Sequence, residues 1–284
     1  MEYLVIDVGG TAIKYACMNE NAEFLERGEI PTPMDSLDSY LAALGTIIHR
    51  YDHNVEGIAM CVPGIIDSVQ GVCITGGNLR YVKDLPLATL LEERYGLRVS
   101  LENDARCAAL AELWRGSLKN CADGVVIVLG SAVGGALVKN GSIHKGSHFS
   151  AGEISFIEKD GDISDICNSV GYQNGVLSLY RLVEQQTGIP VAELDGIRIF
   201  EMANRGDAGV LEAIDRFAKS LARVIYNIQS SAASDVYKRQ HSGDLRPGSV
   251  CGRRRDQSAK PFHRVTDPQR GFYIQSVAIH SPPG

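Results

Sequence analysis

The 284-residue chain is 44% hydrophobic and 22% charged, which suffices for a sizeable core and for two domains of ordinary size. Its net charge of −6 argues against nucleic-acid binding, and no apolar run approaches the roughly 18 residues of a membrane span. The N-terminus shows no basic segment with a cleavage site, and the seven scattered cysteines contain no C-x-x-C pair, which is typical of reduced packing residues. We therefore expect a cytoplasmic globular protein without nucleic-acid or membrane partners.

The first third of the chain predicts an antiparallel meander followed by alternating helices and strands. Extended runs at 3–8, 12–18 and 23–30 surround a Gly9-Gly10 turn, and apolar residues at 3.6 spacing predict a helix from Leu37 to Tyr51. Further strands are expected at 57–62, 65–74 (around a turn at 68–71) and 97–101, and further helices at 85–95 and 105–115. This order indicates an α/β domain with a mixed sheet.

The pattern then begins again. Residues 124–129 predict a buried strand, 130–135 a glycine-rich turn and 136–139 another strand, and helices are expected at 175–186 and 210–228. We interpret this as two domains of related design, 1–118 and 119–230, with a cleft between them.

The last segment is a different kind of sequence. Residues 231–284 carry 9 Lys and Arg against 4 Asp and Glu, and 5 of the 10 prolines. A basic tail for a partner or nucleic acid is one interpretation. The other is a non-native terminus from a frameshift or assembly junction, because a strand that should follow the long helix is missing. We expect this tail to be poorly ordered.

The stretch Asp7–Thr11 suits a phosphate cradle. Gly9 and Gly10 leave backbone N–H groups open to an anion, Thr11 adds a hydroxyl donor, and Asp7 can hold the water shell of Mg²⁺. A plain hairpin turn also uses Gly-Gly, and the motif alone does not separate the two. With the second turn, the pattern suits a nucleotide held between two lobes, while G-x-x-x-x-G-K-S/T and G-x-G-x-x-G loops are absent from the sequence.

Phosphoryl transfer also needs a base for the acceptor's proton, and Asp104 is the candidate. It follows Asn103 at the end of a predicted strand and opens a helix, a position that faces the ligand in α/β sheets. An ordinary helix N-cap is the alternative. Asn103 and Asn78 offer both donors and acceptors to a hydroxyl-rich ligand, and Glu153 suits two sugar hydroxyls, although a solvated surface glutamate fits the same pattern.

These motifs, in this order and spacing, resemble the ROK family over roughly residues 3–230. The matching stretches are Asp7–Lys14 (DVGGTAIK), Val62–Asp67 (VPGIID), Asn78–Leu79, Glu102–Ala105 (ENDA), Leu129–Ala136 (LGSAVGGA) and Ala151–Glu153 (AGE). The family comprises sugar kinases and sugar-responsive repressors. The resemblance implies an α/β, two-lobed, actin-like (ribonuclease H-like) ATPase fold with mixed sheets and a central cleft.

The resemblance also implies roles for individual residues. Asp104 would deprotonate a hexose hydroxyl, most often the 6-hydroxyl, for attack on the γ-phosphate of ATP, with Mg²⁺ bound through water near Asp7. The residues implied to hold the sugar are Gly64, Asn78, Asn103 and Glu153. Those implied to hold the nucleotide are Asp7, Gly9, Gly10, Thr11, Lys14, Gly130, Gly134 and Gly135. Homodimers are common in the family.

Three departures from the family pattern qualify this assignment. Phe156 stands where many members have a histidine that touches sugar and binds zinc, and Cys167 stands without the zinc-binding cysteine cluster. We therefore predict no zinc, and a more apolar sugar pocket, as suits β-glucosides or acylated mannosamines beside glucose and fructose. The tail lacks the family's strand and Gly-Gly-Gly turn that packs on adenosine.

Two alternatives to a sugar kinase follow. Loss of the adenosine site would leave a sugar-binding protein without turnover. A repressor of the same family is the less favoured alternative, because such proteins carry an N-terminal helix-turn-helix domain and this chain begins at the first strand.

Overall fold

The computed structural model describes residues 1–159, 161, 164–232 and 274–280, of which 230–232 and 274–280 are described by their backbone alone. The remainder of the expected tail lies outside the described residues. The chain forms two compact units, residues 1–111 with 145–151, and the described residues of 112–144 and 152–284. The boundary expected at 118 therefore falls earlier, inside a helix, and the segment 145–151 belongs with the first unit.

The first unit is built on a five-stranded sheet in the order β3-β2-β1-β4-β8. Its strands are β1 (Glu2–Val8), β2 (Ala12–Asn19), β3 (Phe24–Pro31), β4 (Gly57–Val62) and β8 (Arg98–Asn103). β1, β2 and β3 form the predicted antiparallel meander, whereas β1, β4 and β8 run parallel. Because the carboxyl ends of parallel strands meet at one edge of a sheet, residues that follow β1, β4 and β8 gather there.

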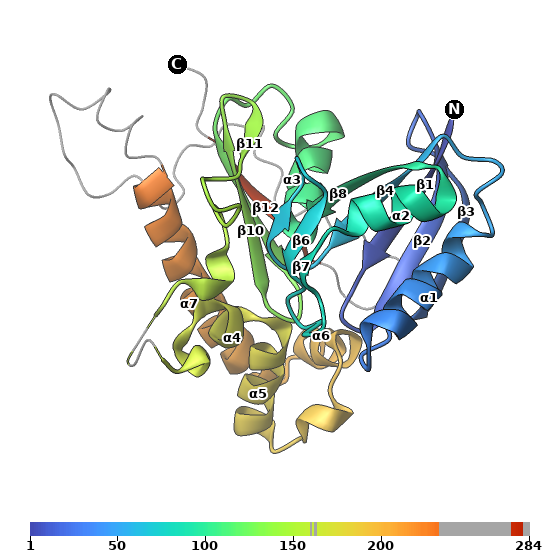
Figure 1. Cartoon of the computed structure of the whole chain (residues 1–284). Helices are drawn as coiled ribbons and strands as arrows, with labels where there is room; N and C mark the ends of the chain where they lie inside the picture. The colour runs from blue at the N-terminus through green and yellow to red at the C-terminus, as the bar shows by residue number, and fades with distance from the viewer. Residues whose placement is uncertain (160, 162–163, 233–273, 281–284) are drawn as a thin grey trace, which may run out of the picture. The chain divides into compact units, whose positions relative to one another are not determined.

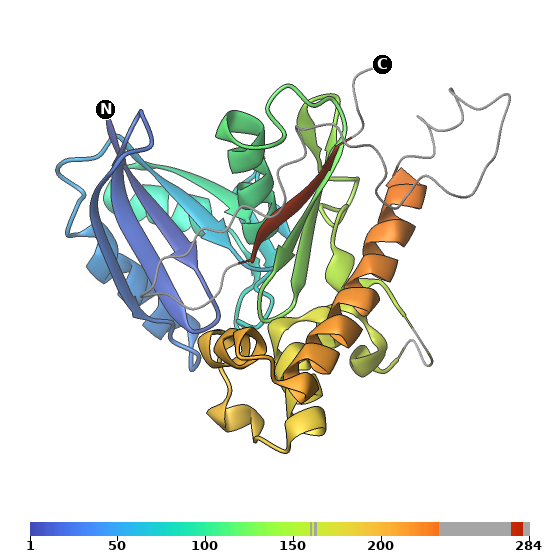
Figure 2. The ribbon, with the colours of Figure 1, turned by 180° about the vertical axis from the view of Figure 1, so that it is seen from behind.

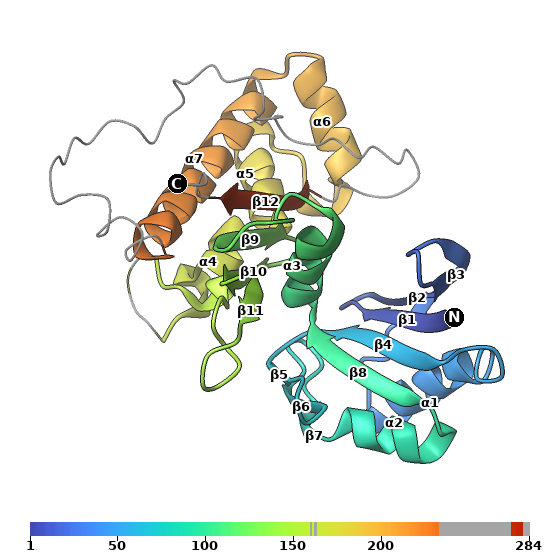
Figure 3. The ribbon, with the colours of Figure 1, turned by 90° about the horizontal axis from the view of Figure 1, so that it is seen from above.

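Two helices, α1 (Leu37–Ile48) and α2 (Leu87–Tyr95), cover one face of this sheet, as Figure 3 shows. The Ser36 side chain caps α1 by accepting the N–H of Ser39. Tyr40, Leu44 and Ile48, four residues apart, are completely buried against the sheet. Gly96, with a φ of 68°, ends α2 in the left-handed conformation that glycine adopts without strain.

A small antiparallel sheet follows β4 in the chain. It consists of β5 (Ile66–Asp67), β6 (Val72–Thr75) and β7 (Lys83–Leu85). β7 was not predicted, since Leu85 was assigned to the start of a helix. In the structure Leu85 pairs with Cys73, and Pro86 precedes the first helical residue, where its missing N–H costs no hydrogen bond.

The second unit is built on a four-stranded sheet in the order β11-β10-β9-β12. Its strands are β9 (Gly124–Leu129), β10 (Val133–Lys139), β11 (Ser142–His144) and β12 (Ile274–His280). The long helix α7 (Ala208–Ala232) runs beside this sheet (Figure 2), and its Val224 and Ile228 share a core with Val125 and Ile127 of β9.

Shorter helices complete the unit around α7 (Figure 1). They are α4 (Val170–Asn174), α5 (Val176–Thr187), α6 (Gly196–Asn204) and the 3-10 turns η1 (Ile154–Phe156), η2 (Ile166–Asn168) and η3 (Val191–Glu193). The helix α3 (Asp104–Arg115) lies mostly in the first unit, and the boundary between the two units falls within it. α4 and α6 were not predicted. Within the described part of the chain, no helix has both the length and the apolar character needed to cross a bilayer.

The expectation that the tail adds no strand was wrong for residues 274–280. β12 pairs antiparallel with β9, from Ile274 opposite Leu129 to His280 opposite Gly124, with a register shift between Ile274 and Val277. This short run contains several β-branched residues, which favour a strand. The strand also provides hydrogen-bond partners for backbone groups along the edge of β9 that would otherwise be unpaired.

Candidate active site

The first predicted cradle is a hairpin turn whose polar backbone groups remain accessible. Asp7 lies opposite Lys14 in the β1–β2 ladder, and the N–H of Gly9 donates to the carbonyl of Ala12 at 3.0 Å. Among the described residues, neither Gly10 nor Thr11 donates its N–H to a backbone carbonyl. The turn is a hairpin, as one alternative held, and it also has the open N–H groups that the phosphate interpretation requires.

Thr32 holds this turn in place, a role that was not predicted. Its hydroxyl donates to the carbonyl of Gly9 at 2.7 Å, and its N–H donates to the carbonyl of Thr11 at 3.0 Å. Thr32 lies at the far end of β3, 23 residues away, so a local pattern could not reveal it.

The side-chain cap of α3 comes from Asn103 and not from Asp104. The Asn103 side chain caps α3, since its Oδ1 accepts the N–H of Arg106 at 3.1 Å. Asp104 is the first helical residue, and its carboxylate accepts the N–H of Ala105 at 2.8 Å. Asp104 reaches solvent, yet loss of solvation around its carboxyl group raises its pKa, an effect that the hydrogen bonds from Ala105 and Asn103 only partly offset.

Asp104 lies close enough to Asp7 for its negative charge to act on the Asp7 carboxyl group. Loss of solvation raises the pKa of Asp7, Lys14 lowers it, and the negative charge of Asp104 raises it further. Cys61 of β4 pairs in register with Asp7 of β1 on one side and with Glu102 of β8 on the other. The Cys107 thiol, burial and the charges of the two aspartates all raise its pKa. The sheet edge therefore concentrates negative charge.

The residues predicted to bind sugar in this unit also come together. Asn103 donates its side-chain N–H to the carbonyl of Gly64 at 3.0 Å. Gly64 has a φ of 97°, and a Cβ there would come within 2.3 Å of the Thr75 carbonyl, so only glycine fits. The Asn78 side chain lies beside Gly10, whose added Cβ would be 3.8 Å from the Asn78 Nδ2.

The second glycine turn is shorter than predicted. It occupies residues 130–132, since Val133 already pairs with Leu129, and both Gly134 and Gly135 belong to β10. A Cβ on Gly135 would come within 2.5 Å of the Gly152 carbonyl, which explains a glycine inside a strand. The Gly130 carbonyl accepts the N–H of Val176 at the start of α5, at 2.9 Å.

Glu153 lies in this second unit, directly before η1. Gly152, with a φ of 89°, brings the chain against Ala136 of β10, so Glu153 follows a segment held on the same strand as Gly134 and Gly135. Phe156, three residues later, exposes 68% of its surface. Among the described residues no three metal-ligating side chains gather, and the absence of zinc stays a prediction.

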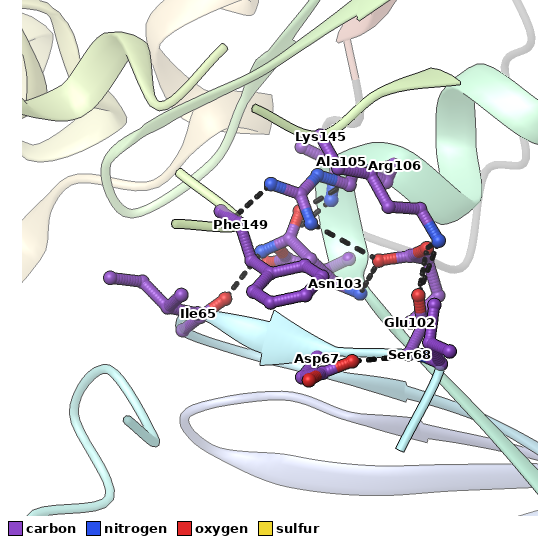
Figure 4. Close-up of polar contacts among 12 residues, drawn as sticks. Ile65, Asp67, Ser68, Glu102, Asn103, Ala105, Arg106, Lys145 and Phe149 are labelled. Carbon is purple, nitrogen blue, oxygen red and sulfur yellow. Dashed lines mark hydrogen bonds and ion pairs between the residues drawn. The ribbon is translucent and has the colours of Figure 1, made fainter. Parts of the chain in front are cut away.

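A buried polar cluster beside Asn103 escaped the sequence analysis. It joins Glu102, Arg106 and Lys145, with Ser68 and the Phe149 carbonyl (Figure 4). Only Glu102 was noticed, as part of a motif. Lys145 and Ser68 are 77 residues apart in the chain, so no spacing rule relates them.

Comparison with known proteins places this arrangement in a family. Residues 3–236 match the ROK family. The chain belongs to the ROK family.

A beta-glucoside kinase from Klebsiella pneumoniae is 30% identical over 230 residues, covering 80% of this chain and 77% of its own. An N-acetyl-D-glucosamine kinase from Vibrio cholerae is 31% identical over 243 residues, which cover 80% of this chain and 79% of that kinase. A protein of known structure from Listeria monocytogenes is 28% identical with a TM-score of 0.74, and the match covers 82% of this chain and 80% of that protein. These comparisons confirm the resemblance to ROK sugar kinases, the enzyme class and the two-lobed actin-like α/β fold.

Proposed function

We propose that this ROK protein phosphorylates a hexose or hexoside hydroxyl with ATP, the 6-hydroxyl in the simplest case, and that Asp104 is the general base. The carrying observation is that Asp7 and Asp104 lie at the carboxyl ends of two strands of one sheet, where the charge of Asp104 raises the pKa of Asp7, beside a glycine turn with open N–H groups. The named kinases among the relatives support the same reaction class.

Asp104 has the properties of a base for an alcohol. Its raised pKa brings it closer to neutral pH, where a base removes a proton from a hydroxyl most efficiently. Its place at the first residue of α3 holds the carboxylate at the sheet edge rather than in solvent at large. Little other covalent chemistry is needed, because phosphoryl transfer depends mainly on positioning and charge.

The nucleotide phosphates would bind to the open N–H groups of Gly10 and Thr11, with Lys14 opposite Asp7 adding positive charge. In the second unit, Gly130, Gly134 and Gly135 are the proposed nucleotide-binding residues, a role that rests on the family match. The negative potential around Asp7 fits Mg²⁺, which binds through one or two carboxylates, waters and substrate phosphates. Mg²⁺ would supply charge neutralisation on the phosphates.

In the first unit, Gly64, Asn78 and Asn103 would bind the sugar. Glu153 is the proposed sugar-binding residue of the second unit. Asn103 donates to the Gly64 carbonyl and to the Asp104 carboxylate and accepts the N–H of Arg106, so its amide oxygen retains a second lone pair for a sugar hydroxyl. The exposed Phe156 ring near Glu153 favours an apolar substituent, as in a β-glucoside or an N-acylated hexosamine. We also place the enzyme in the cytoplasm, where ATP is available, and propose a homodimer.

A sugar-binding protein without turnover is the second candidate. The family match ends at residue 236, so most of the tail has no counterpart in the family's pattern. Whether the adenosine end of the nucleotide is held decides between the two candidates.

A coupled ADP-release assay with glucose, N-acetylmannosamine, fructose and cellobiose tests the proposal. It compares this chain with a version in which residues 231–284 are replaced by the C-terminal segment of the Klebsiella pneumoniae relative. We expect sugar-dependent ADP release, falling about tenfold per pH unit below the pKa of Asp104. Because that pKa is raised, the fall should begin above the ordinary aspartate value of about 3.9.

Asp104→Asn should lower kcat about 10³-fold while sugar affinity changes less than about threefold. Asp84→Asn, at an exposed position of the same unit, is the matched control. Sugar binding without ADP release in both versions of the chain would favour the binding-only candidate. Full activity of Asp104→Asn would exclude Asp104 as the base.

A further inference from the structure

Arg106 is a charged side chain that the fold buries completely. Its exposed fraction is 0%, and it is among the largest fully buried side chains of the chain. Removing a guanidinium from water is unfavourable, and apolar residues of similar volume often serve stability as well or better. A buried arginine on the helix that begins with the proposed base therefore suggests a task beyond packing.

The Arg106 guanidinium joins two separate parts of the chain. One of its terminal nitrogens, Nη2, donates to the carbonyl of Phe149 at 2.5 Å, and the other, Nη1, reaches Glu102 at 3.4 Å. Its Nε has no hydrogen-bond partner among the described residues. The planar guanidinium thus links the end of β8 to the loop 145–151 (Figure 4).

Glu102 extends the link to a second anchor of that loop. Its Oε2 lies 3.0 Å from the Lys145 ammonium and accepts the Ser68 hydroxyl at 3.0 Å, while Lys145 also contacts Ser68 directly. Its Oε1 accepts the N–H of Asn103 at 3.0 Å. The Glu102 carboxylate therefore contacts Lys145 of the loop, Ser68 in the turn between β5 and β6, and the backbone of Asn103, a proposed sugar-binding residue.

The loop 145–151 is held at two points, Lys145 and Phe149, four residues apart. Gly146 and Phe149 adopt left-handed φ angles of 68° and 54°. A non-glycine residue rarely takes that conformation unless other contacts impose it, and the bond from Arg106 to the Phe149 carbonyl is such a contact. Ser147 and His148, between the anchors, are exposed.

We propose that Arg106, with Glu102 and Lys145, positions the loop 145–151 beside Asn103 and thereby makes this loop part of the sugar-binding surface of the first unit. This inference rests on the proposed function. Arg106 acts here as a positioning residue, because its contacts are with Glu102 and the Phe149 carbonyl, and the N–H that Asn103 accepts is unaffected by a change of the Arg106 side chain.

The test measures sugar affinity directly, by calorimetric titration of the full chain with glucose, cellobiose and N-acetylglucosamine, so that it does not require turnover. Arg106→Met should weaken sugar binding about tenfold or more, whereas ATP binding changes less than about twofold, since the Gly9–Thr11 turn lies outside the cluster. Arg106→Lys, which keeps one donor, should restore part of the loss. Arg115→Met, on the exposed end of the same helix, is the matched control.

Lys145→Met provides a second variant that should fold readily, because 31% of the Lys145 side chain is exposed. It should weaken sugar binding about threefold or more, and the double variant should lose less than the product of the single losses, since either change releases the same loop. Amide exchange in residues 145–151 should accelerate in both variants and not in Arg115→Met.

The possible outcomes separate the two proposals. Wild-type chain that binds none of the sugars would contradict the proposed function. Wild-type binding with unchanged sugar affinity in both Arg106→Met and Lys145→Met, or an equal loss of ATP and sugar affinity, would overturn the positioning role alone.

Discussion

The glycine turn after β1 and the glycine turn after β9 share one plan, a buried strand, a short turn and an antiparallel strand. They differ in the pair of residues that lie opposite each other in the β-ladder just before the turn. In the first unit Asp7 pairs with Lys14, whereas at the matching positions of the second unit Val128 pairs with Gly134. Thr32 braces the first turn through side-chain and backbone hydrogen bonds, and the second is packed against the start of α5.

The two turns therefore share a backbone plan and differ in the charge of their side chains. The first unit has the charged and amide groups suited to chemistry, namely Asp7, Asn103 and Asp104. The second unit has a neutral turn, and Gly135, in the strand that follows it, is required by close packing. Two units of the same design thus share their backbone geometry, while individual side chains determine which of the two carries charge at the turn.

Among changes at the two turns, the largest expected effect is that of removing the charge of Asp7, at the end of β1 just before the first turn. Asp7→Asn should lower kcat about 100-fold and raise the Mg²⁺ concentration needed for half-maximal rate, because a preorganised charge at the phosphates is lost. Steady-state kinetics across a Mg²⁺ titration measures both. Asp84→Asn is the control, and a Mg²⁺ dependence equal to wild type in Asp7→Asn would argue against metal near Asp7.

A smaller effect is expected from adding one methyl group to the first turn. A Cβ on Gly10 meets Asn78 at an ordinary 3.8 Å, so Gly10→Ala should change the unfolding free energy by less than about 0.5 kcal/mol. If phosphate approaches this backbone, the KM for ATP should rise about tenfold. Kinetics paired with urea denaturation distinguishes the two effects. An unchanged KM would favour a plain hairpin without ligand.

The same substitution in the second unit should act on stability first. A Cβ on Gly135 would lie 2.3 Å from the Ile154 side chain and 2.5 Å from the Gly152 carbonyl, and the backbone cannot yield easily. Gly135→Ala should therefore destabilise the protein by about 1–3 kcal/mol, measured as a lower urea midpoint. A variant as stable as wild type would mean that β10 and the segment at Gly152 do not pack closely.

Most regular elements of the core could be predicted from local pattern. β4 and β9 have the expected bounds, and α1 and α7 follow from their apolar stripes. The family resemblance, and with it the fold class, followed from short motifs in order. Helices α4 and α6 and strand β7 were missed because they are short and placed by packing rather than by a strong periodic signal.

The amino-acid sequence by itself determined where strands turn on glycine, where a carboxylate ends a strand and which family the chain joins, because these depend on neighbours along the chain. Tertiary structure alone decided that Asp7 senses Asp104, that Arg106 meets Phe149 and that β12 pairs with β9. Such pairings join residues far apart in sequence through sheet register and burial, and no local pattern names the partner in advance.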